Sequence, residues 1–546
     1  MFGKVPERQM HRVRWFLTVS WLLLIVSLFF DPISPWFAQP HNVWSPLRLD
    51  ANACTPMQGA CLPEKPYAIG APVFWGIVIP CAIFILLVFG HELWRRICPL
   101  SFLSQIPRAL GIGRKLRKID GKTGKIRYIP AKVNPNSWLA RNHLYLQLGL
   151  FYGGLCGRIL FFNSARWVLG VFLLFTIAAA IVVGYLWAGK PWCNYFCPMS
   201  AVQRIYSEPR GLLTSPAHLN THRGIPQSMC RTVDGKGKEK SACVACQDPC
   251  IDRDAERSYW ENIKGRDRAF LYYGYCGLVV GYFCYYYLYS GNWDYYFSGA
   301  WAHEETQLAS LFNPGFYLWG QGIPIPKLIA VPLTLGLSGL GGYVVGCKVE
   351  KGYQAYLSRT QQRLKPEMIR HRMFTLCTFF VFNFFFMFSG RNFLDLLPRS
   401  LQYGFNATIV LASTLWVYRT WGRDRERYLR ESLAVRLRKQ LSQLNIDISQ
   451  GLEGRSLETL NPDELYILAK ILPELLENRQ QPDKKEKLQN KINRNLKAAH
   501  PSQSQSSAIT LETVEYLLDR VENRTSPPVS MSEIEWSVPS DNLTPF

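Results

Sequence analysis

Long apolar runs constrain this chain more than any other feature of its sequence. About eight of them recur along the 546 residues, and each approaches the ~20 residues with which a helix crosses the hydrocarbon core of a bilayer. They lie near residues 14–30, 71–90, 143–162, 167–187, 269–289, 325–346, 373–390 and 404–420. The sequence therefore predicts a mainly α-helical, polytopic transmembrane protein that spans the membrane lipid bilayer about eight times.

Basic residues fall in alternate connections between these runs. The formal charge is +22; the segments 91–141, 188–268 and 347–372 and the stretch after residue 420 are basic, whereas residues 290–324 contain no Lys or Arg. Because cytoplasmic connections carry the excess of Lys and Arg, this asymmetry predicts that both termini are cytoplasmic. No stacking or groove-reading motif accompanies the basic residues, so nucleic acid is not expected as a partner.

The runs and their connections divide the chain into six predicted parts. The first four are 1–70, with one span and a non-cytoplasmic loop; 71–142, with a span and a Cys-Pro unit; 143–210, with two spans and a Cys-x3-Cys-Pro unit; and 211–268, a cytoplasmic loop. Four further spans follow in 269–420, and residues 421–546 form a polar cytoplasmic module with short helices at 461–479 and 510–524 and a tail.

The predicted topology sorts the 15 cysteines by compartment. Cys54 and Cys61 lie on the non-cytoplasmic side, where a disulfide is favoured. Cysteines inside or at the ends of the spans are interpreted as small apolar residues; they are Cys81, Cys156, Cys276, Cys284, Cys347 and Cys377. The remaining seven lie on the reducing cytoplasmic side, where dense cysteine indicates metal or redox chemistry; they are Cys98, Cys193, Cys197, Cys230, Cys243, Cys246 and Cys250.

Three of these thiols follow one another at ferredoxin-like spacing, Cys243-x2-Cys246-x3-Cys250. A bacterial ferredoxin run is Cys-x2-Cys-x2-Cys with a distant Cys-Pro, so the second gap here is one residue longer. A zinc ribbon needs two Cys-x2-Cys knuckles, and a thioredoxin-like dithiol needs Cys-x2-Cys in a βαβ unit. The spacing favours a [4Fe-4S] cluster over zinc, and zinc over a dithiol.

An internal repeat links two further cysteines. The segment GHELWRRICPLSFLSQI (90–106) aligns without a gap on GKPWCNYFCPMSAVQRI (189–205), with Cys98-Pro99 over Cys197-Pro198 and Trp94 over Cys193. Each copy follows an apolar run, so the repeat predicts two pseudo-symmetric helical units that present ligands at the same membrane face. The first copy is either a degenerate relic or contributes Cys98 to a shared site.

A span, a Cys-x3-Cys-Pro unit and a ferredoxin-like cysteine cluster together resemble the membrane-bound polyferredoxins. This family includes the quinol-dehydrogenase membrane component of periplasmic nitrate reductase, the nitrous-oxide-reductase regulator and the copper-reducing oxidase-assembly protein. The resemblance covers roughly residues 70–270 and implies [4Fe-4S] centres at the cytoplasmic face of a bacterial-type cytoplasmic or internal energy-transducing membrane. It implies single-electron transfer between a carrier or quinone and a partner, as a component of an oxidoreductase.

Seven thiols fall one short of the eight that two complete clusters require. We expect one cluster bound by Cys243, Cys246 and Cys250, with Cys230 or Cys197 as the fourth ligand. A second cluster would use Cys193, Cys197, Cys98 and a group other than cysteine. The alternative function is an assembly factor for another membrane complex, which would reduce a metal ion or sense the state of its own cluster.

The surrounding residues suggest partners. Positive charge near the thiols raises a cluster's potential and attracts an acidic carrier such as ferredoxin or flavodoxin; the candidates are Lys190, Arg231, Lys236, Lys238 and Lys240. The other candidate protein partner is a membrane redox complex. The tyrosine-rich segment 272–297 is a candidate quinone pocket, although aromatic residues at the membrane interface explain most of it.

Overall fold

The computed structural model describes residues 5–49, 54–119, 124, 126–214, 230–361 and 364–443. The chain divides into two units, of which the first comprises Met1–Ala217 and Arg223–Gly422. The described part of the second unit contains helix α16 (Arg425–Gln443). The helices predicted at 461–479 and 510–524 lie outside the described residues, as does the portion 215–229 of the predicted cytoplasmic loop.

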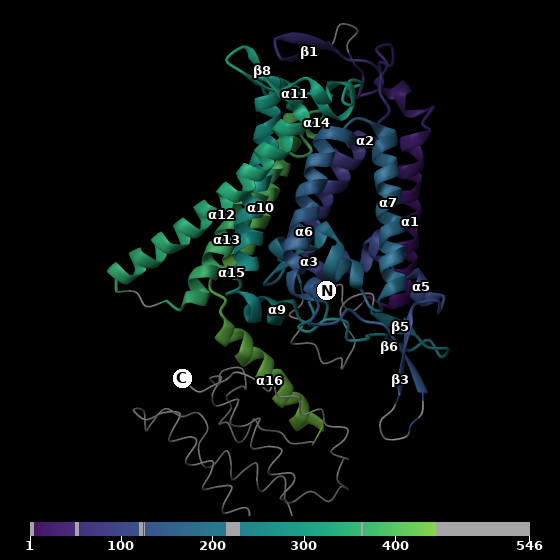
Figure 1. The fold of residues 1–546 in the computed structure, drawn as a ribbon, viewed down its shortest axis with the longest axis vertical. Coiled ribbons are helices and arrows are strands. Elements are labelled where there is room, and N and C mark those ends of the chain that lie inside the picture. The colour runs from purple at the N-terminus through teal and green to yellow at the C-terminus, as the bar shows by residue number, and fades with distance from the viewer. Residues whose placement is uncertain are drawn as a thin grey trace, which may run out of the picture. The chain divides into compact units, whose positions relative to one another are not determined.

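The first unit is built on long helices, six of which are long and apolar enough to cross a membrane (Figure 1). These are α1 (Glu7–Phe29), the composite Gly70–Leu103, the composite Trp138–Phe162, α7 (Arg166–Leu186), α12 (Lys327–Arg359) and α13 (Pro366–Phe388). The first composite joins α2 (Gly70–Val73), η3 (Phe74–Val78), α3 (Ile79–Ile97) and α4 (Pro99–Leu103), and the second joins α6 (Trp138–Gly157) to η4 (Arg158–Phe162).

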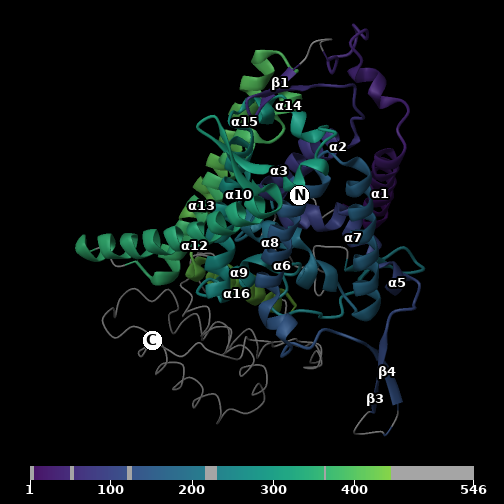
Figure 2. The same cartoon turned by 45° about the horizontal axis from the view of Figure 1, so that its top comes forward.

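The other two predicted spans also form helices, α10 (Arg266–Ser290) and α15 (Arg399–Trp421). Their 25 and 23 residues are enough to cross a bilayer, but they fall outside the six helices that satisfy both the length and the apolarity requirements. Helix α10 is rich in tyrosine and mostly buried, and it packs against α12, α13 and α6 (Figures 1 and 2). Six spans are therefore identified by length and composition, and the count of about eight stays a prediction.

Small residues allow α10 and α12 to approach closely. An added Cβ at Gly277 of α10 would lie 2.1 Å from the carbonyl oxygen of Ser338, and one at Gly342 of α12 would lie 2.7 Å from the Cα of Gly277. Apolar side chains gain little by leaving lipid for a helix interface, so close backbone packing of small residues holds such helices together. The glycines in these two runs therefore fix the helix pair that carries the buried tyrosines.

One end of the helices carries a disulfide, and we call it the disulfide end. It contains η2 (Ser34–Ala38), β1 (Cys54–Met57), β2 (Ala60–Pro63), α11 (Asp294–Phe297), η7 (Ala300–Ala302), η8 (Ala309–Phe312), β7 (Pro314–Leu318), β8 (Gln321–Pro326) and α14 (Arg391–Leu394). The antiparallel β1–β2 hairpin is closed by the Cys54–Cys61 disulfide, with Cα atoms 5.6 Å apart. Its tip is held by a hydrogen bond from the Gln58 N–H to the Ser290 carbonyl at the end of α10.

The opposite end holds the beginning of α1 and most of the remaining short elements (Figure 1). They are α5 (Ile106–Ala109), β3 (Lys115–Ile119), β4 (Ile126–Pro130), η5 (Trp192–Phe196), α8 (Pro198–Ser207), β5 (Arg231–Val233), β6 (Glu239–Ser241) and α9 (Ala255–Asn262). The strands form two antiparallel hairpins, β3–β4 and β5–β6. The Glu7 N–H donates to the Glu239 carboxylate at 2.6 Å and ties the first helix to β6. We call this the thiol end, because seven cysteines lie there.

Candidate metal centre

The two copies of the internal repeat adopt matching backbone conformations. Gly90 and Gly189 begin them with positive φ angles of 66° and 97°, values that favour glycine. Cys98 and Cys197 then cap α4 and α8 with nearly identical dihedrals, φ −59° and ψ 117° against φ −60° and ψ 119°. Proline follows each cysteine at the first helical position, where its missing N–H costs no hydrogen bond. The repeat therefore presents Cys98 and Cys197 in the same local geometry.

Backbone N–H groups hydrogen-bond to both capping thiols. Leu100 and Ser101 donate to Cys98, and the equivalent Met199 and Ser200 donate to Cys197. Burial raises the pKa of the Cys197 thiol, and the nearby Cys193 and Cys98 raise it further. Cys98, Cys193 and Cys197, which we call the helix-end thiols, therefore interact with one another. Both copies of the repeat thus contribute a cysteine to one group.

The β5–β6 hairpin gathers the other cysteines. Arg231 pairs with Ser241, and the Ala242 N–H donates to the Cys230 carbonyl at 3.0 Å, so the chain on either side of the hairpin brings Cys230 beside Cys243. Cys243, Cys246 and Cys250, which we call the loop thiols, follow directly. Burial raises the pKa of Cys250 to about 12, and the charges of Asp252 and Cys246 add to this effect. Burial likewise raises the pKa of Cys246.

The loop of these thiols packs directly on the second repeat. A Cβ at Gly189 would lie 2.5 Å from the Cys246 Cβ and 2.7 Å from its Sγ, so no other residue fits there without displacing the cysteine. The Lys190 N–H and the Asn194 side chain both donate to Cys246 Sγ, the latter at 3.4 Å. The Tyr195 hydroxyl donates to the Cys246 carbonyl at 3.3 Å. Cys246 is therefore the point where the loop of Cys243, Cys246 and Cys250 contacts the second repeat.

Arg95, a buried residue of the first repeat, hydrogen-bonds both to the second repeat and to the segment that follows Cys250. Arg95 donates to Asp252 Oδ1, Asn194 Oδ1 and Gln203 Oε1, each at 3.0 Å. It also reaches the Cys193 carbonyl and the Ser200 hydroxyl at 3.4 Å. Arg95 is 1% exposed. These five bonds hold the loop after Cys250 against the segment that carries Cys193 and Cys197.

Asp252 pairs with two cations. Its carboxylate lies 3.0 Å from Arg95 Nη1 and 3.5 Å from Lys190 Nζ. Burial opposes its ionisation, but the charges of Arg95 and Lys190 outweigh this effect and hold its pKa below the usual range. Arg95, Asp252 and Lys190, which we call the ion centre, therefore carry one positive charge in excess.

Lys190 is fully buried, which contradicts the expectation that it attracts a soluble partner. Gly189 turns the chain so that the lysine faces inward, and Nζ has no hydrogen-bond partner among the described residues. Burial opposes its charge, while Asp252, Cys230 and Cys193 raise its pKa. The other cations expected near the thiols, Lys236 and Lys238 among them, are exposed or partly exposed.

These residues fit an iron–sulfur cluster. A buried cation in excess is costly unless an anion balances it, and a cluster with four thiolates carries net negative charge. The N–H groups that point to Cys197, Cys246 and Cys250 are the hydrogen bonds by which a protein tunes such a cluster. Among the described residues, no group of three or more His, Cys, Asp or Glu side chains is already placed to hold a metal ion.

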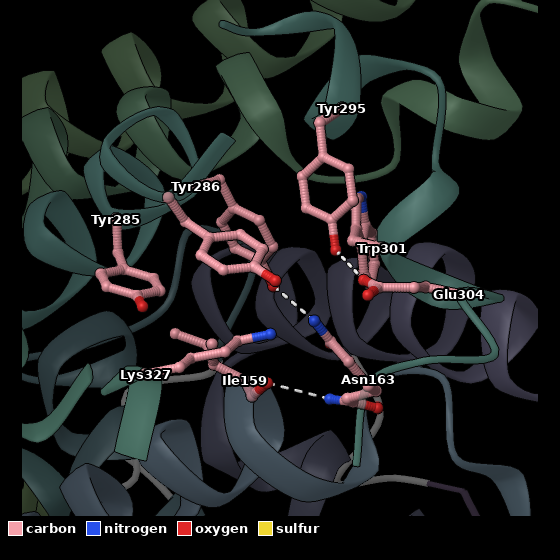
Figure 3. A pocket seen from close by; sticks show the side chains of 10 residues that line it. Ile159, Asn163, Tyr285, Tyr286, Tyr295, Trp301, Glu304 and Lys327 are labelled. Carbon is pink, nitrogen blue, oxygen red and sulfur yellow. Dashed lines mark hydrogen bonds between the residues drawn. The ribbon is translucent and has the colours of Figure 1, made fainter. Parts of the chain in front are cut away.

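A small cavity lies at the disulfide end (Figure 3). Tyr285, Tyr286, Tyr295, Glu304 and Lys327 are among its lining residues, and its volume is about 10 Å³. The Tyr295 hydroxyl donates to Glu304 at 2.5 Å, and Lys327 Nζ lies 4.1 Å from the centre of the Tyr289 ring. Such a volume admits about one water molecule. The tyrosine-rich segment thus surrounds a polar, water-sized space, and a quinone partner stays a prediction.

Sequence reasoning misses two residues of the ion centre, Arg95 and Asp252. In the sequence, Arg95 is one of many cations of the cytoplasmic asymmetry, and Asp252 is one carboxylate in a basic field. One signal is present, because Arg95 aligns with Asn194 in the repeat and the two side chains hydrogen-bond to each other. The partner of Asp252 lies more than 150 residues away in the sequence, and no local pattern reveals such a contact.

Comparison with known proteins supports one part of this site. A family model described as a 4Fe-4S binding domain matches residues 169–216. The matched range begins within α7 and contains Cys193 and Cys197. No curated protein and no solved structure shows significant similarity to the chain. The segment that carries the Cys-x3-Cys-Pro unit is therefore similar to a 4Fe-4S binding domain.

Proposed function

We propose that this chain is an integral membrane [4Fe-4S] protein that passes single electrons at the cytoplasmic face between a soluble carrier or quinone and a partner. The match to a 4Fe-4S binding domain supports the cofactor, and the six apolar helices support the membrane location. The observation that carries the proposal is the interaction of five of the seven cysteines with a buried ion centre that has one cation in excess; they are Cys98, Cys193, Cys230, Cys246 and Cys250. A cluster bound by thiolates supplies the negative charge that this centre lacks.

The loop thiols form the first proposed ligand set, with Cys230 as the fourth ligand. The sequence alone leaves Cys230 and Cys197 as equal candidates for that role. The β5–β6 hairpin favours Cys230, since it brings Cys230 beside Cys243, whereas Cys197 interacts with Cys98 and Cys193. The first set is therefore Cys230, Cys243, Cys246 and Cys250.

The helix-end thiols form the second proposed set. Cys98, Cys193 and Cys197 supply three ligands, and a group other than cysteine would supply the fourth. Cys193 and Cys197 lie within the matched 4Fe-4S domain, and the matching caps of Cys98 and Cys197 support a shared site rather than a relic. The Cys193 carbonyl accepts from Arg95, which also binds Asp252 next to the loop thiols. The two sets would therefore share one ion centre.

The residues around the thiols have the chemistry that one-electron transfer needs. Reduction adds one negative charge to a buried site, and the Lys190 ammonium together with the N–H groups on Cys246 stabilises that charge. Hydrogen bonds from Arg95 hold the segments in place, so little rearrangement accompanies the change of charge. The protein therefore supplies a rigid environment with a net positive electrostatic potential around the thiols.

The experiment that tests the proposal is anaerobic purification with iron and sulfide analysis and paramagnetic resonance of the reduced protein. We expect about four irons and four sulfides for each cubane cluster. Cys246→Ser should abolish the signal of the loop cluster, because it removes a ligand that also anchors the loop. Stoichiometric zinc without sulfide would contradict the proposal.

Cys284→Ser is the matched control for that substitution. Cys284 is a partly buried free thiol within α10, and it belongs to neither proposed ligand set. The iron content and the resonance signal of this variant should equal those of the unmodified protein. Equal loss of signal in both variants would show that any cysteine substitution disrupts the protein. An intact cluster that transfers no electrons would favour the assembly role.

A further inference from the structure

The β3–β4 hairpin is an exposed basic feature of the thiol end. Every residue of both strands is exposed, and the strands carry Lys115, Arg117, Lys118 and Arg127 without a carboxylate. Lys118 and Arg127 lie directly opposite each other in the register. An isolated two-stranded hairpin is marginally stable, and neighbouring like charges do not stabilise it. Its composition therefore suits contact with an anionic surface better than folding alone.

The base of the hairpin is fixed to the helices. The Arg114 N–H donates to the Tyr185 carbonyl at 2.9 Å, and the Ala188 N–H donates to the Ala131 carbonyl at 2.7 Å. Lys132 Nζ reaches the Ala245 carbonyl, between Cys243 and Cys246, at 3.3 Å. The hairpin is therefore anchored beside the loop thiols.

A hollow of about 310 Å³ opens at this base. Arg114 and Lys132 contribute its charge, and Leu116, Val133 and Trp187 contribute apolar surface. The Trp187 ring stacks on Phe196 with centroids 6.0 Å apart, and both rings pack against an apolar cluster that contains Cys193 and Cys197. Trp187 therefore links the hollow to the cluster of Cys193 and Cys197, and Lys132 links it to the loop between Cys243 and Cys246.

We propose that the β3–β4 hairpin and this hollow form the docking site for a small acidic one-electron carrier protein. This inference rests on the proposed function and names the partner and its surface. Acidic groups of the carrier would pair with the hairpin cations, and one apolar side chain would enter the hollow. A reduced carrier gives up one electron and no proton, and the thiol-bound cluster of the proposed function accepts that electron.

The position of the hairpin favours a protein partner over the membrane surface. In both views the strands extend beyond the ends of α1 and α7, away from the apolar helices (Figures 1 and 2). A segment that binds lipid headgroups would lie along the plane of the interface. Binding of the hairpin to anionic lipid is nevertheless one outcome of the test below.

The test measures binding of a purified acidic [2Fe-2S] ferredoxin to the full chain in nanodiscs at low salt, with the electron-transfer rate as a second readout. Arg117→Glu/Lys118→Glu should weaken binding and slow the second-order rate at least tenfold, and raised salt should weaken binding to the unmodified protein. The matched control Lys351→Glu/Arg359→Glu makes the same charge change at exposed positions of α12 and should alter either value less than twofold.

The other results would overturn either the docking site or the proposed function. Equal binding to the hairpin variant and the unmodified protein would overturn the docking site, as would a loss that occurs only in nanodiscs with anionic lipid. Absence of ferredoxin binding to a protein with an intact cluster that dithionite reduces would overturn the docking site and leave the proposed function standing. Absence of any cluster would overturn the proposed function itself.

Discussion

Lys190 shows how one residue connects the backbone of the repeat with the chemistry of the thiols. Gly189 carries the positive φ that directs the lysine inward, and the ammonium lies fully buried near Asp252, Cys230 and Cys193. Asp252 already pairs with Arg95, so one carboxylate serves two cations. Removing one partner of a buried ion pair commonly costs roughly 3–5 kcal/mol. The ion centre is therefore both structural support and a source of positive potential.

Lys190→Met is expected to lower the reduction potential of the loop cluster. Reduction makes the cluster more negative, so loss of a neighbouring positive charge destabilises the reduced form. A change of about 60–120 mV follows if the interaction is worth one to two tenfold factors at about 59 mV each. A redox titration followed by paramagnetic resonance measures this change.

Lys264→Met is the control for this substitution. Lys264 is also paired with a carboxylate, that of Glu367 at 2.9 Å, but its side chain is 70% exposed, so solvent screens its charge. The reduction potential of the loop cluster in this variant should stay within about 10 mV of the value in the unmodified protein. An unchanged or higher potential in Lys190→Met, with full signal intensity, would show that Lys190 does not act on the cluster.

The repeat element, rather than any single cysteine, gives the site its geometry. Each copy begins with a glycine at positive φ and continues to a cysteine that caps a helix. The two segments therefore turn away from the preceding helices in the same way. The second copy also positions the loop thiols, because the Cys246 side chain packs on Gly189. Gly189 is therefore required for two reasons: its backbone dihedral angle and the space that the Cys246 side chain occupies next to it.

Gly189→Ala should release the loop thiols and lower the iron content by at least the amount of one cluster. The new methyl group would lie 2.5 Å from the Cys246 Cβ, at a backbone angle that also disfavours alanine. Iron analysis and resonance after anaerobic purification measure the loss. Gly111→Ala is the matched control, because Gly111 also has a positive φ, 74°, but no atom of the described residues lies within 4 Å of the added methyl. Similar iron loss in both variants would attribute the effect to the dihedral angle alone.

At the scale of the whole molecule, the two ends of the helices differ in their cysteine chemistry. The Cys54–Cys61 disulfide lies at one end, and the seven thiols lie at the other. Disulfides persist in oxidising compartments, and free thiols and thiolate clusters are typical of reducing ones. This separation supports the proposed orientation, with the thiol end in the cytoplasm.

Labelling of reporter cysteines with a membrane-impermeant maleimide tests that orientation. In sealed cells without an outer membrane, Trp44→Cys should react before lysis, since Trp44 is exposed between α1 and β1. Lys351→Cys, exposed on α12, should react only after lysis. The opposite pattern would invert the topology and place the thiols outside the cytoplasm.

Local hydrophobicity and residue spacing were enough to predict the helical class, the six apolar helices and the iron–sulfur character of the segment around Cys193 and Cys197. Continuous runs of about 20 apolar residues predict helices that can cross a membrane wherever they pack, and three cysteines within eight residues predict metal chemistry in a reducing compartment. Helices rich in tyrosine, such as α10, are harder to classify, since hydropathy does not distinguish burial in a helix bundle from contact with lipid.

The grouping of the thiols and the ion pair between them follow from contacts between segments that are far apart in the sequence. Cys98 joins Cys193 and Cys197 because two distant helix ends meet, and Cys230 joins the loop thiols because a short hairpin closes. Arg95 and Asp252 form one ion pair across 157 positions of the chain. Such contacts depend on which helices pack together, which is a property of the whole fold, so Lys190 changed from an expected surface charge into a buried one.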